Sequence, residues 1–305
     1  MRRATLLLLL TAGACATSEA DPGQPQPGTK PPQPQGYTRF ETQPTPLVPG
    51  ASVLRVEWVA PAMTEDMDVL DIRGWQSKAG HHALLYAIVE EQPVGTVRNW
   101  KNEDQLSSSL IGGSGGEAGG QLKLPPGVVM RLRKGRALVV QLHYLNTSRE
   151  MVMGQSVIDV KLAPASPARR VASAFASTST QVALPPGPSK MDIDCKLDTD
   201  VSFLMVSNHQ HHLGTSSYTE QLRPDGNRQD IKRDDRWEEE WAFNPNFSRF
   251  EVNAPLVIKA GTTLHTHCEW MNGAGEQVKF PDEMCVFFGF FLGEQDLYCV
   301  DGVRQ

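Results

Sequence analysis

The amino-acid sequence predicts an all-β protein built from β-sandwiches. Short apolar runs rich in Val, Leu and Phe recur along the chain, and Gly, Pro, Asn or Asp residues bound them. No stretch repeats apolar residues at the period of a long amphipathic helix. Many short strands separated by turn residues are typical of sandwiches. The strands that we expect are 52–60, 82–90, 137–145, 156–163, 202–210, 251–258, 262–270 and 284–292.

Length and charge limit the classes of function. The 305 residues are enough for two ordinary domains. The formal net charge is −6 and no cluster of Lys and Arg stands out, which argues against nucleic acid as a partner. Residues 163–170 (APASPARR) combine small residues with two prolines, as inter-domain linkers do. We therefore expect one folded domain over 47–163 and a second over 171–305.

The N-terminal segment 1–20 predicts an export signal. Two arginines precede a short apolar run at 4–10, and small residues follow it. That run is too short to span a bilayer as a mature helix. Cys15 follows small residues as in a bacterial lipobox, although Ala12 stands where leucine is usual. We favour lipidation of Cys15 over ordinary cleavage nearby. The expected location is the bacterial cell envelope or the medium, with membrane contact only through the lipid.

Residues 21–46 predict a disordered tether. This segment is rich in Pro, Gln, Gly and Thr, and such a composition cannot bury enough apolar surface to offset the entropy of ordering. A tether beyond a lipidated cysteine would hold the folded body away from the membrane.

Export changes the meaning of the cysteines. Beyond Cys15 the chain has four, namely Cys195, Cys268, Cys285 and Cys299. An even number in an oxidising compartment predicts two disulfides. Four cysteines allow three connectivities, and the sequence pattern does not choose among them.

Six of the eight histidines fall into three tight groups: His81-His82, His143, and the run 209–212 (HQHH). Imidazole suits copper, zinc, iron and nickel, whereas a thioether selects copper. With Met284 from the run PDEMC, the histidines give two ligand sets, one in each half of the chain: His81, His82 and His143, and His209, His211 and Met284. A histidine-only set beside a histidine-plus-methionine set indicates a redox protein with two coppers.

Strand geometry bears on both sets. His209 and His211 are two residues apart, so a regular strand would turn both rings to one face. The adjacent His81 and His82 would face opposite ways on a regular strand. One shared metal therefore requires a bulge or a strand end at this point, and Gly80 permits it.

A further pair, His265 and His267, also lies two residues apart on an expected strand, just before Cys268. It could be a third metal set. No third ligand of matching character stands out in the sequence, so we expect this pair to be non-essential.

The chain resembles the copper type II, ascorbate-dependent monooxygenases, a family that includes peptidylglycine α-hydroxylating monooxygenase and dopamine β-monooxygenase. The resemblance rests on GHHALL, LPPGVVMRL followed by VVQLHYLN, HQHHLG, AGTTLHTHCEW and DEMCVFF, in this order. It extends over residues 48–300. It implies two jelly-roll-like β-sandwich domains in tandem, with a copper site in each and a solvent-filled cleft between the sites.

The resemblance also implies a division of roles between two coppers. The first, held by His81, His82 and His143, would store and relay an electron. The second, held by His209, His211 and Met284, would bind dioxygen where a substrate C–H bond is hydroxylated. Ascorbate or another external reductant would restore both.

Three further features follow from the resemblance. Gln141, two residues before a ligand histidine, matches a residue beside the electron-transfer route. Cys268 and Cys285 match a disulfide next to the methionine ligand. Cys195 and Cys299 match a disulfide that closes the same domain.

The chain departs from the peptide-hydroxylating members at the groups that bind the substrate carboxylate. Ser207 stands where they have arginine, and Val286 and Phe288 stand where they have asparagine and tyrosine. A peptide C-terminus would therefore leave its charge unpaired, and peptidylglycine is not the expected substrate. Four residues favour an apolar or aromatic substrate instead: Phe247, Phe250, Phe287 and Phe288.

The expected function is therefore an exported copper-dependent monooxygenase that acts on a small organic molecule. A non-catalytic copper-binding protein on the same scaffold is one alternative. A structural or adhesive β-sandwich with incidental histidines is another. Copper stoichiometry separates the last from the other two. Oxygen uptake driven by ascorbate and a substrate separates the first two.

Overall fold

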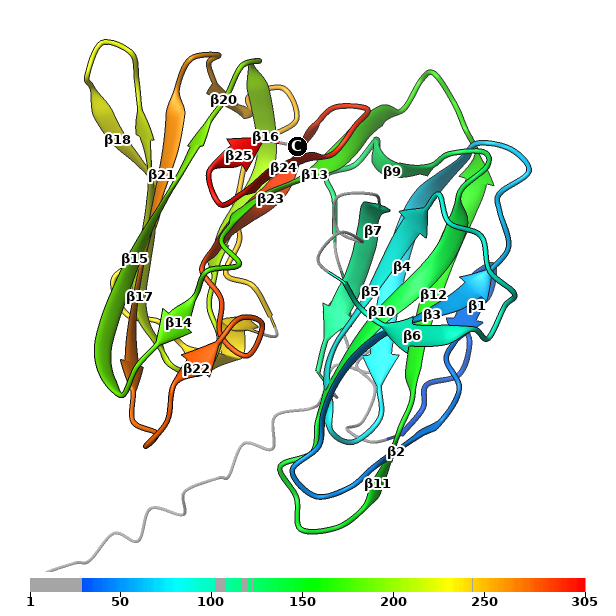
Figure 1. The fold of residues 1–305 in the computed structure, drawn as a ribbon. Helices are drawn as coiled ribbons and strands as arrows, with labels where there is room; N and C mark the ends of the chain where they lie inside the picture. The colour runs from blue at the N-terminus through cyan, green and yellow to red at the C-terminus, as the bar shows by residue number, and fades with distance from the viewer. Residues whose placement is uncertain (1–28, 102–107, 117–119, 122, 243, 305) are drawn as a thin grey trace, which may run out of the picture.

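The structure, a computed structural model, is almost entirely β-sheet (Figure 1). It describes residues 29–101, 108–116, 120–121, 123–242 and 244–304. Within these ranges the one helical element is a 3₁₀ turn, η1 (Glu239–Ala242). The all-β prediction is confirmed. No helix among the described residues has the length and hydrophobicity needed to cross a membrane. Cys15 and the predicted export signal lie outside the described residues.

The largest sheet has twelve strands and runs through both halves of the chain. Its main path is β1-β12-β4-β9-β13-β23-β16-β19, with β8 paired to β4, β20 to β16, β24 to β13 and β25 to β24. Its strands are β1 (Thr38–Glu41), β4 (Met67–Gln76), β8 (Gly120–Gln121), β9 (Val128–Leu132), β12 (Ser156–Pro164), β13 (Arg170–Thr178), β16 (Val201–His209), β19 (Ser248–Arg249), β20 (Leu256–Ile258), β23 (Val286–Leu292), β24 (Leu297–Val300) and β25 (Val303–Arg304).

Two smaller sheets face this large one. The five-stranded sheet β6-β3-β10-β5-β7 comprises β3 (Ser52–Ala60), β5 (Gly80–Ile88), β6 (Val97–Asn99), β7 (Ser108–Gly115) and β10 (Ala137–Leu145). The four-stranded sheet β15-β21-β17-β18 comprises β15 (Gly187–Lys196), β17 (Gly214–Leu222), β18 (Arg228–Asp234) and β21 (Thr263–Asn272). The pairs β2 (Thr45–Leu47) with β11 (Val152–Gly154), and β14 (Ala183–Leu184) with β22 (Val278–Lys279), complete the described strands.

One short parallel pairing joins the halves. Arg170 and Val171 at the start of β13 pair with Val128 and Val129 of β9. Figure 1 shows the strands before β13 gathered on one side of this junction and most of the later strands on the other. The predicted linker 163–170 is shorter than expected, because β12 continues to Pro164 and β13 begins at Arg170.

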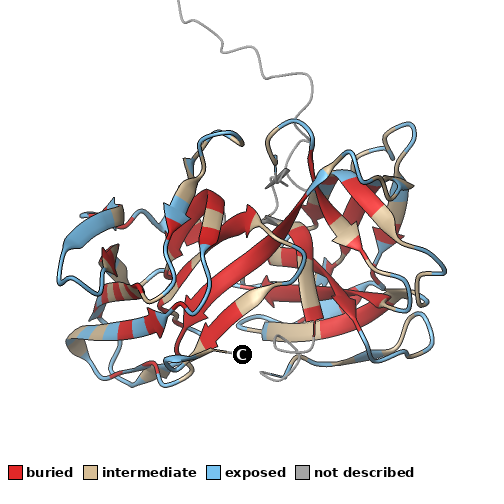
Figure 2. Cartoon of the chain, turned by 90° about the horizontal axis from the view of Figure 1, so that it is seen from above, coloured by how far each residue is buried: buried red, intermediate tan, exposed pale blue. Residues whose placement is uncertain are grey.

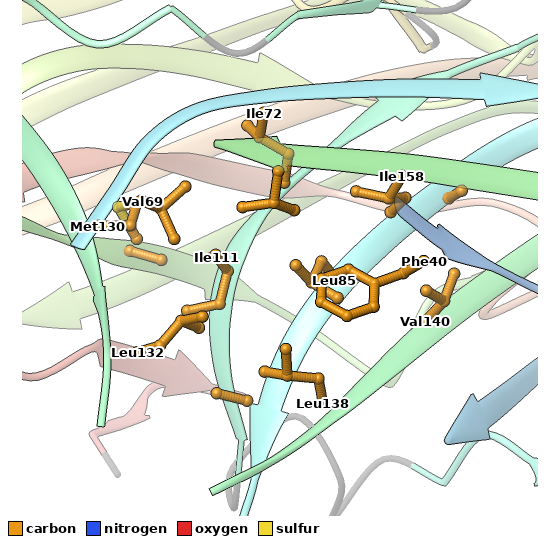
Figure 3. Close-up of a cluster of buried hydrophobic side chains, with 14 of the residues drawn as sticks. Phe40, Val69, Ile72, Leu85, Ile111, Met130, Leu132, Leu138, Val140 and Ile158 are labelled. Carbon is orange, nitrogen blue, oxygen red and sulfur yellow. The ribbon is translucent and has the colours of Figure 1, made fainter. Parts of the chain in front are cut away.

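The first half has a core between two sheet layers (Figure 3). Phe40, Ile72 and Ile158 project from the large sheet, and Leu85 and Leu138 project from the five-stranded sheet. Burying one such side chain contributes about 1.5–3 kcal/mol. Figure 2 shows the buried positions concentrated on the strands and the exposed positions on the loops, as a sandwich requires.

The second half has its own core around three phenylalanines. The rings of Phe175 and Phe203 meet edge to face with centroids 5.2 Å apart, and Phe287 lies 6.0 Å from Phe203. Such aromatic pairs add about 0.5–1.5 kcal/mol each beyond the area they bury. Strands β13, β16 and β23 carry these rings, so the core lies directly behind the strand that ends at His209.

Two disulfides close the second half. The structure joins Cys195 to Cys299 and Cys268 to Cys285, each with a Cα–Cα distance of 5.9 Å. This is the connectivity that the family resemblance implied among the three that counting alone allows.

The prediction of a disordered tether is wrong for residues 38–46. Strand β1 pairs with β12, and β2 pairs with β11. The buried ring of Phe40 and the fully buried Leu47 anchor this segment in the first core. The segment 21–46 as a whole is rich in Pro and Gln, so its composition did not reveal the short strands at its C-terminal end.

Some predicted strands form with the predicted bounds, and others are shorter than predicted. Residues 52–60 and 137–145 form strands with the predicted bounds, whereas only Leu256–Ile258 of the predicted strand 251–258 is extended. Strands β15, β17 and β18 have only a weak strand signal in the sequence, because one face of their sheet meets solvent. Their burial alternates between exposed and buried positions, and few of their side chains are large and apolar.

A buried carboxylate ties the two halves together. Asp296 accepts hydrogen bonds from the backbone N–H of Leu110 in β7 (3.0 Å), from that of Ala174 in β13 (2.8 Å), and from the Tyr298 hydroxyl (3.0 Å). Burial nevertheless raises the pKa of Asp296 to about 6. The folded protein therefore binds more protons at this carboxyl group than the unfolded chain between about pH 4 and pH 6.

The free energy of unfolding should depend on pH in a way that reflects the raised pKa of Asp296. Because its folded-state pKa is raised, its contribution to stability falls as pH rises through this window and levels off above pH 6. The free energy of unfolding of the wild type, minus that of Asp296→Asn, should fall by about 2 kcal/mol from pH 4 to pH 7. Urea unfolding of both proteins across this range measures it. A difference that does not change with pH would contradict the assignment.

Candidate metal centre

Strands β5 and β10 bring three histidines together. His82 pairs directly with His143, but the next residue of β10, Tyr144, pairs with Gly80. His81 is therefore an extra residue in β5, which is the bulge that the adjacent histidines required. The bulge lets both neighbouring rings approach His143, with centroids 4.6 Å away for His81 and 5.3 Å for His82.

The buried side chain of Gln76 holds this bulge in place through hydrogen bonds. The Gln76 side-chain amide donates to the backbone oxygens of His82 (3.0 Å) and His143 (3.4 Å) and to the Ser156 hydroxyl (3.1 Å). A Cβ on Gly80 would lie 2.3 Å from the Cβ of Gln76, so a glycine is required for this close approach. Gln76 thereby fixes both histidine-bearing strands at the point where they pair.

The ring nitrogens of the three histidines converge. His81, His82 and His143 each offer one nitrogen, and these nitrogens lie within 4.8 Å of one another. The Nδ1 atoms of His81 and His82 are 3.1 Å apart. His82 Nε2 lies 3.0 Å from the Gln141 amide oxygen, which can only accept, so this nitrogen carries the proton and Nδ1 keeps its lone pair. The Ser52 hydroxyl contacts His143 Nε2 at 3.2 Å.

The three rings are held in the neutral form that binds metals. Burial, together with the neighbouring imidazoles, lowers the pKa of His82 to about 3 and that of His143 to about 4. The same causes lower the pKa of His81 even further. A cluster of neutral imidazoles with converging nitrogens is a metal-binding arrangement.

The second histidine pair forms where a strand ends. Strand β16 ends at His209, and His211 lies beyond it, so the expectation that both sit on one regular strand is wrong. The rings still meet, with centroids 5.0 Å apart at 89°. His211 Nδ1 lies 2.9 Å from the carbonyl oxygen of Asp282 and donates to it. The other nitrogen, His211 Nε2, is buried and has no hydrogen-bond partner among the described residues.

Glu283 holds the methionine segment against the histidine pair. Its side chain is fully buried. Its carboxylate accepts hydrogen bonds from the backbone N–H of His211, of Leu213 (2.9 Å) and of Met284 (3.1 Å). The Cys268–Cys285 disulfide fastens the residue that follows Met284. Glu283 thus ties Met284 to the turn that carries His211, and the disulfide ties the same segment to β21.

The two ligand sets share one cavity. It measures about 550 Å³ and is lined by members of both sets, including His82, His143, His209, His211 and Met284. The ring of His81 lies 5.3 Å from that of His211. The resemblance implied sites facing each other across a solvent-filled cleft, but here one histidine of each set is in ring contact with the other.

The walls of the cavity are largely apolar. Phe247 and Phe288 line it and meet edge to face at 5.3 Å, whereas Phe250 and Phe287 pack into the second core instead. The alternation of side chains along β23 explains why the adjacent Phe287 and Phe288 differ. Ser207 is fully buried, donates to the Asn208 carbonyl oxygen and is not part of the lining.

One charged side chain, Arg249, belongs to the described lining. Its Nη1 donates to the Lys123 carbonyl oxygen at 2.8 Å. Its guanidinium carbon lies 5.6 Å from the centre of the Phe247 ring. These contacts bind Arg249 to the wall of the cavity.

The donors fit copper. One set offers three neutral imidazoles with converging nitrogens. The other offers His211 Nε2, a buried lone pair that nothing in the described structure satisfies, beside a thioether that lines the same cavity. Imidazole and thioether donors together select copper over zinc or iron.

Sequence reasoning missed the residues that hold these donors. Gln76, Glu283 and Ser52 act through hydrogen bonds to backbone groups or to ring nitrogens, and such partners depend on the fold. Glu283 stands inside the DEMC motif, but a carboxylate there reads as a surface acid until its burial is known.

Glu283→Gln should loosen the second set selectively. An amide has one acceptor oxygen in place of two, so at least one of the three backbone N–H groups loses its partner. Supporting residues of this kind typically contribute about 10- to 100-fold to metal affinity. We expect a loss of that size at the His209/His211/Met284 set and none at the His81/His82/His143 set.

Copper titration of the Glu283→Gln protein, beside an exposed control such as Glu240→Gln, measures this loss. Equal weakening of both sets would mean that Glu283 acts only through general stability.

Comparisons with known proteins agree with the donor chemistry. Residues 171–304 match the family model described as copper type II ascorbate-dependent monooxygenase, C-terminal domain. A comparison with curated proteins gives no match.

Among solved structures, the major capsid protein P2 of bacteriophage PM2 is 8% identical, with a TM-score of 0.35 over 83% of this chain and 97% of that one. PNGase F, a glycosylasparaginase from Flavobacterium meningosepticum, is 10% identical, with a TM-score of 0.38 over 85% and 97%. These likenesses are too weak to inform the function.

The family match covers the half that carries His209, His211, Met284 and both disulfides. The family is copper-dependent and uses ascorbate, which supports an oxidoreductase. Residues 171–304 are therefore similar to the C-terminal domain of the copper type II ascorbate-dependent monooxygenases.

Proposed function

We propose that this protein is an exported monooxygenase with two coppers, which hydroxylates a C–H bond of a small organic substrate. It would use dioxygen and ascorbate or a similar reductant. The observation that carries the proposal is one cavity lined by two different ligand sets, one of three imidazoles and one of two imidazoles and a thioether. Two disulfides in the described chain support an oxidising location outside the cytosol.

The proposed architecture is two jelly-roll-like domains, each with one copper site. The first includes residues 47–163 together with strand β1 and strand β2, and the second spans 171–305. The core around Phe175, Phe203 and Phe287 lies wholly in the second half, which supports this division, although the core of the first half also takes in Leu204 and Phe290. The Asp296 contacts to β7 and β13 would fix how the halves face each other.

The side chains have distinct proposed tasks. His81, His82 and His143 would hold the electron-storing copper, and Gln141 would orient His82 through its amide oxygen. His209, His211 and Met284 would hold the second copper, with the Asp282 carbonyl fixing the tautomer of His211. When bound, copper supplies the redox chemistry that activates dioxygen.

The ring contact of His81 with His211 would give electrons a short path between the two proposed copper sites. Their centroids are 5.3 Å apart, so the path crosses a single contact between imidazoles. Gln141 lies at the other edge of the first set, against His82. The proposed relay therefore needs no long stretch of protein between the sites.

The walls of the cavity limit the substrate. Phe247, Phe288 and Val286 present apolar surface, and the three groups that would bind a peptide carboxylate are absent. A charged peptide terminus would be desolvated there without a partner. An apolar or aromatic molecule is the proposed substrate class, and peptidylglycine is not.

Oxygen consumption tests this proposal. Copper-loaded protein with ascorbate should consume dioxygen faster when a small aromatic or amine substrate is added, and hydroxylated product should match the extra oxygen consumed. The alternative is a copper-binding protein without turnover, which would hold the same copper and leave every substrate of such a screen unchanged.

A further inference from the structure

The outer face of the four-stranded sheet carries a second group of histidines and carboxylates. His265 and His267 lie on β21 and point to the same face. Asp192 and Asp194 lie directly opposite them on β15, with Asp192 paired to His267 and Asp194 to His265. None of these four residues lines the copper cavity. The sequence offered no third ligand for the histidine pair, and the neighbouring strand supplies it.

One carboxylate oxygen lies between the two rings. Asp192 Oδ1 is 2.6 Å from His267 Nδ1 and 3.4 Å from His265 Nε2. In a tetrahedral zinc site, metal–nitrogen bonds of about 2.0–2.1 Å place neighbouring donors about 3.3 Å apart. The two distances to Asp192 bracket that spacing. The nitrogens of His265 and His267 gather less tightly than the His81/His82/His143 nitrogens, so a histidine ring must turn together with the half-exposed Asp192 side chain to close on an ion.

The remaining ring nitrogens are already held by other carboxylates. His265 Nδ1 lies 2.7 Å from Asp194 Oδ1, and His267 Nε2 lies 3.3 Å from Glu269 Oε1. The Ser216 hydroxyl donates to the other oxygen of Glu269 at 2.9 Å. Histidines that bind metals commonly donate their second nitrogen to a carboxylate in this way, which fixes both tautomer and ring orientation.

An aromatic side chain fixes the second ring further. Tyr218 stacks on His267 with centroids 5.0 Å apart and planes at 24°. The guanidinium carbon of Arg233 lies 4.4 Å from the Tyr218 ring on the same sheet. The His265 and His267 side chains are 17% and 12% exposed, so both rings are largely covered at their edges while their carboxylate partners remain open to solvent. An ordinary surface ion pair contributes little and does not require rings fixed at both nitrogens.

We propose that His265, His267 and Asp192 bind one divalent transition-metal ion of the zinc, nickel or copper(II) class. Asp194 and Glu269 orient the rings, and water completes the coordination. Two imidazoles with one carboxylate are borderline ligands of the kind these ions prefer, and they lack the thioether that selects copper(I). The ion links β15 to β21 on the face away from the second core. This site is separate from the two proposed copper sites and does not depend on them.

Zinc is the probe for the test. The full-length protein is first loaded under reducing conditions with two equivalents of copper(I), which the imidazole and thioether sets prefer, so the carboxylate-containing site stays open to Zn²⁺. Equilibrium dialysis of that protein against Zn²⁺, with metal analysis, should give one zinc per chain beyond the copper already bound. His267→Gln should weaken zinc binding more than tenfold. Asp194→Asn should weaken it about tenfold, since it removes only the partner that orients His265.

The matched control is His212→Gln, because His212 is exposed and belongs neither to the two proposed copper ligand sets nor to the His265/His267 pair. It should bind zinc as the wild type does. Equal copper content in all variants would show that these substitutions leave the two proposed copper sites unaffected. Wild-type protein that takes up no zinc would overturn the proposal. Zinc affinity that is unchanged in His267→Gln, or reduced equally in His212→Gln, would also overturn it.

Discussion

Replacing His143 with alanine should abolish coupled hydroxylation while leaving the second site intact. His143 supplies one of three converging nitrogens, and its partner in the register is His82. Losing even a residue that orients a ligand costs about 10- to 100-fold in metal affinity, so losing a ligand itself should cost more. Hydroxylation consumes two electrons, and a protein that stores only one cannot complete it in a coupled manner. Product formation should therefore fall to background.

The second site should survive this change. His211 and Met284 take their support from Asp282 and Glu283, and these hydrogen bonds do not involve His143. Infrared spectra of the reduced His143→Ala protein under carbon monoxide should show the same band as the wild type, with copper content reduced by one. The exposed His212→Ala protein is the control and should keep full activity. Loss of the carbon monoxide band in His143→Ala would assign the roles in reverse.

Replacing Met284 with histidine should separate metal binding from oxygen chemistry. Imidazole is a competent copper ligand, so Met284→His should still hold two coppers. A harder donor holds Cu(I) less well than a thioether does, so the reduced state at this site should be less favoured. We expect near-normal copper content with product formation lowered far below the wild type.

Metal analysis beside single-turnover product formation measures both parts of the Met284→His prediction. Wild-type product formation in Met284→His and in His143→Ala would show that these ligands do not carry the chemistry.

Some of the site could be predicted from the sequence because it depends on local spacing. Adjacent His81 and His82 require a bulge to share a metal, and the structure has one next to Gly80. The approach of His209 to His211 was also expected, but by the wrong geometry. β16 ends at His209, and a turn rather than strand alternation brings His211 back to it.

Other parts of the site depend on contacts between distant segments. Gln76 and Glu283 are polar residues whose importance comes from full burial and from the backbone groups they bind. Nothing in a single sequence distinguishes such residues from surface ones. The contact of His81 with His211 likewise depends on how the two halves pack across β9 and β13.

The expectation that Phe287 and Phe288 both face the substrate conflicts with strand geometry, because adjacent residues on a strand point to opposite faces. Phe287 belongs to the core and Phe288 to the cavity. The early strands β1 and β2 were missed for a different reason, because their few apolar residues are diluted by a segment rich in Pro and Gln.

Copper stoichiometry tests the central claim most directly. Purified protein should be loaded with copper(I) under reducing conditions, dialysed and analysed for metal per chain, together with His143→Ala and the double variant His143→Ala/His211→Ala. The account predicts two coppers in the wild type, one in His143→Ala and none in the double variant. A wild type that retains one copper or none, or a double variant that still retains two, would contradict it.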